Sequence, residues 1–132
     1  MKTLLMMVVL VTSNAAFAQD RVLLDCNNGA LTVHETRESR GNVAFSLIVH
    51  DQGVIDYLQS RGIKGNGLRD DGSLEFAGGF YRSEGLLQVR TYFKTYTLVR
   101  KGMGARLGLV EEPSHGGLAF AEWYFESCVG EL

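Results

Sequence analysis

The sequence predicts an all-β protein, a mostly antiparallel β-sandwich or small β-barrel of seven to nine strands with one short helix. One observation is that short runs of apolar, β-branched and aromatic residues recur between turns, as is typical of antiparallel strands. The other is that the 132 residues include 16 glycines, well above the usual share of about 7%. Most of these glycines stand singly between the apolar runs, where they favour turns.

The first 18 residues have the layout of a secretory signal peptide. A single cation, Lys2, precedes the apolar segment 4–11, and Ala16-Phe17-Ala18 matches the small-residue pattern of a cleavage site. We therefore expect a periplasmic or secreted protein that is cleaved after Ala18. Removing 18 residues from the chain of 132 leaves 114, a single β-rich domain at residues 19–132. A short buried helix is the alternative interpretation.

The charge balance excludes some classes of partner. One of the 13 basic residues is Lys2, so residues 19–132 carry 12 basic and 15 acidic side chains and a formal charge of −3. A nucleic-acid partner is not predicted, because it requires a basic face. No later segment is as long as a membrane-spanning helix.

Both cysteines, Cys26 and Cys128, lie near the ends of the expected domain. In an exported protein such a pair predicts one disulfide, which closes a loop of about 100 residues and makes the two terminal strands neighbours. Free thiols or an intermolecular bond are the alternatives. A zinc site is not predicted, because there is no second cysteine pair.

Taken in order, the apolar runs predict a succession of strands. Asn27-Asn28-Gly29 is a strong turn signal and predicts a hairpin between the first two strands. The segment 73–82 forms either two short strands around Gly78-Gly79 or one strand with a bulge. The other expected strands are 21–26, 30–37, 43–50, 105–111 and 118–129.

The longest stretch without glycine or proline is LLQVRTYFKTYTLVR at 86–100. It predicts one long strand of roughly 50 Å, which must bend between two sheets or curl around a barrel. A period of two puts Leu87, Val89 and Phe93 on its dry face and Tyr92, Tyr96 and the cations on the other. That second face is either a further core face or a contact surface, because aromatic and cationic residues are enriched at protein interfaces.

One segment departs from strand periodicity. Asp51 is a suitable helix N-cap, Val54, Ile55, Tyr57 and Leu58 have helical spacing, and Gly62 is placed to end the helix. A helix of two to three turns is therefore expected within 51–62.

No constellation of residues predicts catalysis, a metal site or a cofactor. His34-Glu35 and His50-Asp51 lie on adjacent expected strands, but their spacing matches no metal motif. Ser114-His115 lacks a nucleophile elbow. The acidic pairs Asp70-Asp71 and Glu111-Glu112 fall in turns, where acidic residues are common. We expect a protein that is not an enzyme.

The loops 63–71 and 111–117 are long and polar for a small domain, and loops on a rigid β-scaffold commonly carry recognition. They predict contacts with a protein partner through Lys64, Asn66, Arg69, Asp70, Glu112, Ser114 and His115.

The layout of Cys26 after a strand, a glycine-containing turn, a β-rich middle and Cys128 in the last strand resembles the small periplasmic lysozyme inhibitors of Gram-negative bacteria. The resemblance implies a β-barrel whose ends are stapled by a disulfide and an S-G-x-x-Y loop that enters the lysozyme cleft. The nearest segment here is Lys64-Gly65-Asn66-Gly67-Leu68, which has neither the serine nor the tyrosine. A looser similarity is to periplasmic immunity proteins, which neutralise secreted cell-wall or membrane-attacking enzymes.

From these features we expect an exported binding protein that inhibits or neutralises a partner enzyme through its surface loops. The expected enzyme is a cell-wall-degrading or a toxic one. The alternatives are a small β-barrel carrier of an apolar ligand or envelope-assembly factor and, third, a small hydrolase.

Overall fold

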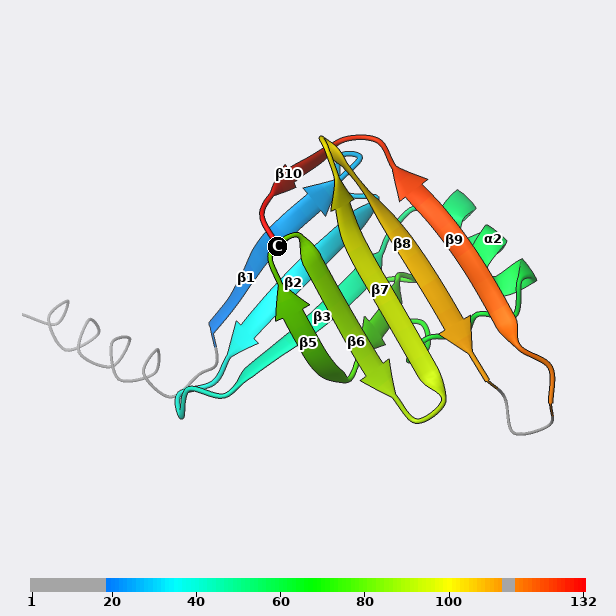
Figure 1. Cartoon of the computed structure of the whole chain (residues 1–132), viewed down its shortest axis with the longest axis horizontal. Helices are drawn as coiled ribbons and strands as arrows, with labels where there is room; N and C mark the ends of the chain where they lie inside the picture. The colour runs from blue at the N-terminus through cyan, green and yellow to red at the C-terminus, as the bar shows by residue number, and fades with distance from the viewer. Residues whose placement is uncertain (1–18, 113–115) are drawn as a thin grey trace, which may run out of the picture.

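The computed structural model describes residues 19–112 and 116–132 and is mostly β (Figure 1). The predicted leader 1–18 lies outside the described residues. The elements, in chain order, are β1 (Gln19–Cys26), β2 (Leu31–Arg37), β3 (Val43–Val49), α2 (Gln52–Ser60), β4 (Leu74–Ala77), β5 (Gly79–Ser83), β6 (Leu86–Thr91), β7 (Lys94–Lys101), β8 (Gly104–Glu111), β9 (Ala119–Phe125) and β10 (Cys128–Gly130).

The strands form two antiparallel five-stranded sheets, in the orders β10-β1-β2-β3-β4 and β5-β6-β7-β8-β9. The chain crosses from the first sheet to the second at Gly78, between β4 and β5, and returns between β9 and β10. Glycine is required at position 78 because a Cβ there would collide with the carbonyl oxygen of Arg90. The all-β prediction is confirmed, and the two sheets form a sandwich that is joined at two corners (Figure 1).

Side chains alternating at a period of two fill the space between the sheets. In β2, for example, Leu31 and Val33 are fully buried while the alternate residues Thr32 and His34 are partly exposed. The largest fully buried side chains are those of Tyr96, Phe76 and Phe125, and the rings of Phe76 and Tyr96 pack edge to face with centroids 4.7 Å apart.

The predicted helix is confirmed as α2. The Asp51 carboxylate accepts a hydrogen bond of 3.0 Å from the Val54 amide, which caps the N-terminus. Val54, Ile55 and Leu58 are buried in the core. On its other side the helix lies next to β9 (Figure 1). There the rings of Tyr57 from α2 and Trp123 from β9 pack with centroids 5.2 Å apart.

The predicted long strand at 86–100 is wrong. It is two strands, β6 and β7, joined by a tight turn at Tyr92-Phe93, and the pairs Leu87↔Leu98 and Val89↔Tyr96 lie opposite each other. The turn reverses the chain, so the odd-numbered residues of β6 and the even-numbered residues of β7 point into the core. The predicted strand 118–129 is likewise two strands, β9 and β10, in different sheets.

The predicted disulfide is confirmed. Cys26 and Cys128 lie directly opposite each other in β1 and β10, with Sγ atoms 2.02 Å apart. The bond joins the first and last strands, and both cysteines are buried. A disulfide indicates an oxidising, extracytoplasmic compartment.

Candidate partner-binding site at one end of the sandwich

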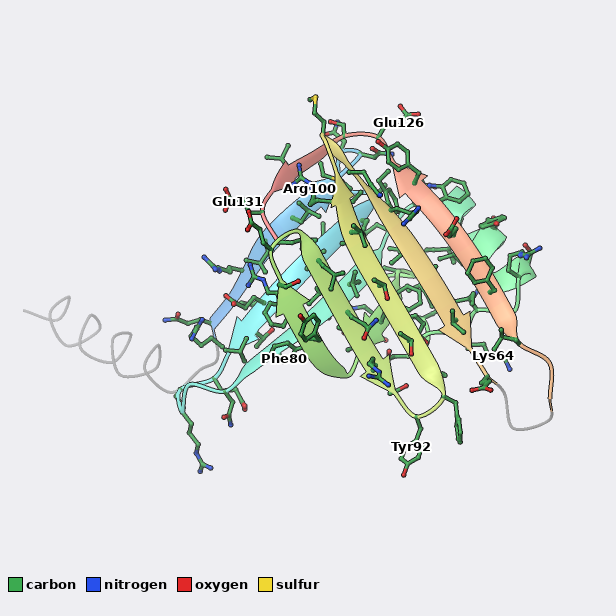
Figure 2. All side chains as sticks on the ribbon, in the orientation of Figure 1. Lys64, Phe80, Tyr92, Arg100, Glu126 and Glu131 are labelled. Atoms are coloured by element: carbon green, nitrogen blue, oxygen red, sulfur yellow. A yellow bond between two sulfur atoms is a disulfide. The ribbon has the colours of Figure 1, made fainter. Side chains whose placement is uncertain are left out.

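One end of the sandwich carries a groove of about 570 Å³. Four segments line it, namely residues 62 and 64 after α2, residues 92–94 at the β6–β7 turn, and the two ends of the β8–β9 connection, 111–112 and 117–119. Figure 2 shows Lys64 and Tyr92 at this end and Glu126 at the opposite end. These segments lie far apart in the sequence, so the groove is created by the fold.

Two aromatic residues project at the edge of the groove. The side chains of Tyr92 and Phe93 are 88% and 63% exposed, and their ring centroids are 5.6 Å apart. Phe93 has a φ of 61°, a conformation that costs a non-glycine residue roughly 1–3 kcal/mol. Glycine or asparagine is the usual residue at such a turn position. Neither burial nor turn geometry therefore accounts for the two aromatic side chains at this tip.

A buried carboxylate fixes the floor of the groove. Glu111, at the end of β8, is 5% exposed. Its carboxylate accepts hydrogen bonds from the Lys64 amide at 3.0 Å, the Gly65 amide at 2.8 Å and the Tyr96 hydroxyl at 2.6 Å. Burial, together with this hydrogen bond to Glu111, raises the pKa of Tyr96 well above its ordinary value. The network ties the segment after α2 to β7 and β8.

Two further contacts hold the rim in place. The Lys94 ammonium donates to the Gly65 carbonyl oxygen at 2.8 Å, and the Glu112 amide donates to the Phe93 carbonyl oxygen at 2.8 Å. The hairpin tip is therefore attached to both neighbouring segments, and its aromatic side chains project from a fixed backbone.

The predicted contact residues separate into three groups. Lys64 and Glu112 line the groove. Asn66 has a structural contact, because its amide oxygen accepts a hydrogen bond of 2.8 Å from the Ala77 amide, and Arg69 and Asp70 lie outside the lining, in the exposed turn before β4. Ser114 and His115 lie outside the described residues.

Sequence reasoning missed part of the lining. The predicted strand 86–100 puts Phe93 on a dry face, whereas the Phe93 side chain is exposed at a turn. The predicted strand 118–129 includes Leu118, which is exposed and precedes β9. Tyr92 was included in an aromatic and cationic face with Tyr96, but Tyr96 is fully buried and Tyr92 is exposed. The available signal was a pair of aromatic residues between two cations, Arg90 and Lys94.

The acidic pairs considered for catalysis are accounted for by structural contacts or by separate environments. Hydrogen bonds from the Ser73 hydroxyl and amide lower the pKa of Asp71, and the charges of Arg69 and His50 lower it further. Glu111 and Glu112 do not share an environment, since one is buried and the other is exposed. Across 19–112 and 116–132, no three His, Cys, Asp or Glu side chains are grouped so as to hold a metal ion.

No protein-family model, curated protein or solved structure matches this chain. No helix in the described part of the chain is long and apolar enough to cross a membrane.

Proposed function

We propose that this is an exported, periplasmic or secreted protein that binds a partner enzyme at the groove end of the sandwich and blocks it. The observation that carries the proposal is the exposed pair Tyr92 and Phe93 at a strained turn. Aromatic residues are enriched among the residues that dominate binding energy at protein interfaces. Strain retained at a surface turn is typical of functional sites.

The shape of the site favours a concave partner surface. The β6–β7 turn is a narrow protrusion, and the groove beside it presents apolar Leu118 together with the charged side chains of Lys64 and Glu112. An aromatic tip surrounded by charged groups is suited to enter a cleft and to be bordered by polar contacts at the rim. We infer that the cleft belongs to a cell-wall-degrading or toxic enzyme.

The rigidity of the scaffold supports this proposal. The tip is fixed by the Glu112 to Phe93 hydrogen bond and by the Glu111 network below it. A pre-organised loop loses less conformational entropy on binding than a mobile one. The Cys26–Cys128 disulfide adds stability in an oxidising compartment, and the leader expected at 1–18 would direct the chain there.

The alternative of an apolar-ligand carrier receives less support, because large side chains such as those of Tyr96, Phe76 and Phe125 occupy the space between the sheets. The alternative of a hydrolase depends on Ser114-His115 and on the acidic pairs Asp70-Asp71 and Glu111-Glu112. In these acidic pairs, Glu111 and Asp71 accept structural hydrogen bonds, and Asp70 and Glu112 are exposed.

The test is affinity capture with the processed protein, residues 19–132, against periplasmic and secreted cell-wall hydrolases, followed by inhibition assays on each captured enzyme. We expect capture at micromolar concentrations and dose-dependent inhibition. Tyr92→Ala should weaken binding at least about tenfold. Met103→Ala is the matched control, since Met103 is 75% exposed on the β7–β8 turn at the opposite end of β7. Capture of no hydrolase, or equal binding by the Tyr92 variant, would contradict the proposal.

A further inference from the structure

The outer face of the first sheet carries a chain of four polar side chains. The Nδ1 atom of His34 lies 3.4 Å from a carboxylate oxygen of Asp20. The Nε2 atom of His34 is 2.9 Å from the Thr32 hydroxyl oxygen, and the Nε2 atom of His50 is 3.0 Å from the same oxygen. Two imidazole nitrogens, one from β2 and one from the residue that follows β3, therefore converge on one hydroxyl oxygen.

The Asp20 contact determines which nitrogen of His34 is available. A carboxylate near Nδ1 favours the tautomer with its proton on Nδ1, which leaves a lone pair on Nε2. The same arrangement of carboxylate and imidazole orients histidine ligands in metal sites. Because a hydroxyl has only one proton, the Nε2 atom of His50 donates to Thr32 when that of His34 accepts from it. Coordination through the Nε2 atom of His50 therefore requires its proton to move to Nδ1.

Asp25 adds a second carboxylate to this face of the sheet, where it accepts a hydrogen bond from the Gly29 amide. Asp25 lies directly opposite Thr32 in the β1–β2 pairing, and opposite residues of an antiparallel pair point to the same face. The His34 side chain is 20% exposed, and His50 is exposed, so a cation has access from solvent.

We propose that His34 and His50 form a surface site for a divalent late transition-metal ion, with Zn²⁺ as the reference case, in which both Nε2 atoms are ligands and Asp20 orients His34. Imidazole is a preferred ligand of such ions, and water completes the coordination. The two nitrogens, each about 3 Å from the Thr32 oxygen, are at most about 6 Å apart. Zn–N bonds of about 2.0–2.1 Å require a separation of about 3.3 Å at a tetrahedral centre, so the exposed His50 ring has to turn toward His34 on binding.

The composition of this site differs from the histidine and carboxylate pairs considered from the sequence. Glu35 follows His34 on a strand and therefore points to the opposite face, where Arg21 Nε contacts its carboxylate at 2.8 Å. Asp51 caps α2 through the Val54 amide. The fold replaces these two carboxylates with Asp20, which comes from β1.

The test is calorimetric titration of the processed protein with ZnCl₂. We expect saturable binding of one ion per chain, with at least about tenfold weaker binding in His34→Gln and in His50→Gln. The chain has three histidines, so His115→Gln is the matched control and should bind as the wild type does. Thr32→Val keeps both imidazoles and should retain binding, whereas Asp20→Asn should weaken it.

Circular dichroism of each metal-free variant establishes that it is folded, and histidine ring ¹⁵N resonances give a readout at the ligand atoms themselves. On addition of Zn²⁺ the Nε2 resonances of His34 and His50 should shift. No saturable binding, a shift of neither ring, or an equal loss of binding in His115→Gln would overturn the proposal.

Discussion

Replacing Glu111 with alanine should destabilise the protein far more than the same change at its neighbour Glu112. Glu111 accepts hydrogen bonds from the Lys64 and Gly65 amides and from the Tyr96 hydroxyl, and it is 5% exposed. Each donor left without an acceptor costs about 1–3 kcal/mol when buried. Partial hydration of the Lys64 amide reduces the sum, so we expect Glu111→Ala to lower the free energy of unfolding by about 3–5 kcal/mol. Glu112→Ala, at an exposed position, should change it by less than about 0.5 kcal/mol.

The assay is urea unfolding followed by the fluorescence of Trp123, the single tryptophan. Tyr96→Phe tests the same network from the other partner. It leaves Glu111 with both backbone donors, so it should cost about 1–2 kcal/mol. The two changes should be non-additive, because both remove the same hydrogen bond. A loss below about 1 kcal/mol in Glu111→Ala, or equal losses at 111 and 112, would refute the reasoning.

Three further predictions concern the core, the disulfide and the hairpin tip. Burial and the hydrogen bond to Glu111 raise the pKa of Tyr96, so the folded state resists ionisation of this tyrosine. The free energy of unfolding should therefore fall as pH rises above about 10, where the tyrosine ionises in the unfolded chain. In urea unfolding, Tyr96→Phe should show a smaller fall, and the same pH dependence in both proteins would contradict this prediction. Replacing both Cys26 and Cys128 with serine removes a bond between residues 102 positions apart. On the loop-entropy model this change should lower the free energy of unfolding by about 4–5 kcal/mol. An unchanged midpoint of urea unfolding would contradict this prediction. Phe93→Gly should raise the free energy of unfolding by about 0.5 kcal/mol, because glycine adopts a positive φ without strain. The same change should weaken partner binding. A loss of stability would show instead that the aromatic side chain stabilises the fold.

Features set by local chemistry were predictable from the sequence. Asp51 caps α2 because its carboxylate reaches an amide three residues away. Asn27-Asn28-Gly29 has positive φ at all three residues, as these turn formers favour. The disulfide was predictable because the chain has only two cysteines, both near the ends of the expected domain, and the expected leader favours an oxidising compartment.

The β6–β7 turn was not predictable on the same grounds. Tyr92-Phe93 has neither glycine nor asparagine, and both residues favour strands, so local propensity continued the strand across the turn. The tertiary register of β6 against β7 overrides that propensity. Since every side chain changes face after the turn, this single error also misplaced Tyr96.

The candidate site was predicted only in part, because polarity was used to select its residues. Lys64 and Glu112 line the groove, but three other exposed members of the lining, Tyr92, Phe93 and Leu118, are aromatic or apolar. Glu111 had a signal in the sequence. Ala105, Leu107 and Leu109 alternate inward along β8, and continuing that period of two points Glu111 into the core.

The central claim is that the aromatic tip of the β6–β7 hairpin contacts a partner enzyme. A photo-crosslinking amino acid placed at Tyr92 of the full-length chain, expressed in cells, tests this most directly, with the same group at Met103 on the opposite turn as the control. The account predicts a covalent adduct with a cell-wall-degrading or toxic enzyme from position 92 and none from position 103. No adduct from position 92, or the same adducts from both positions, would contradict it.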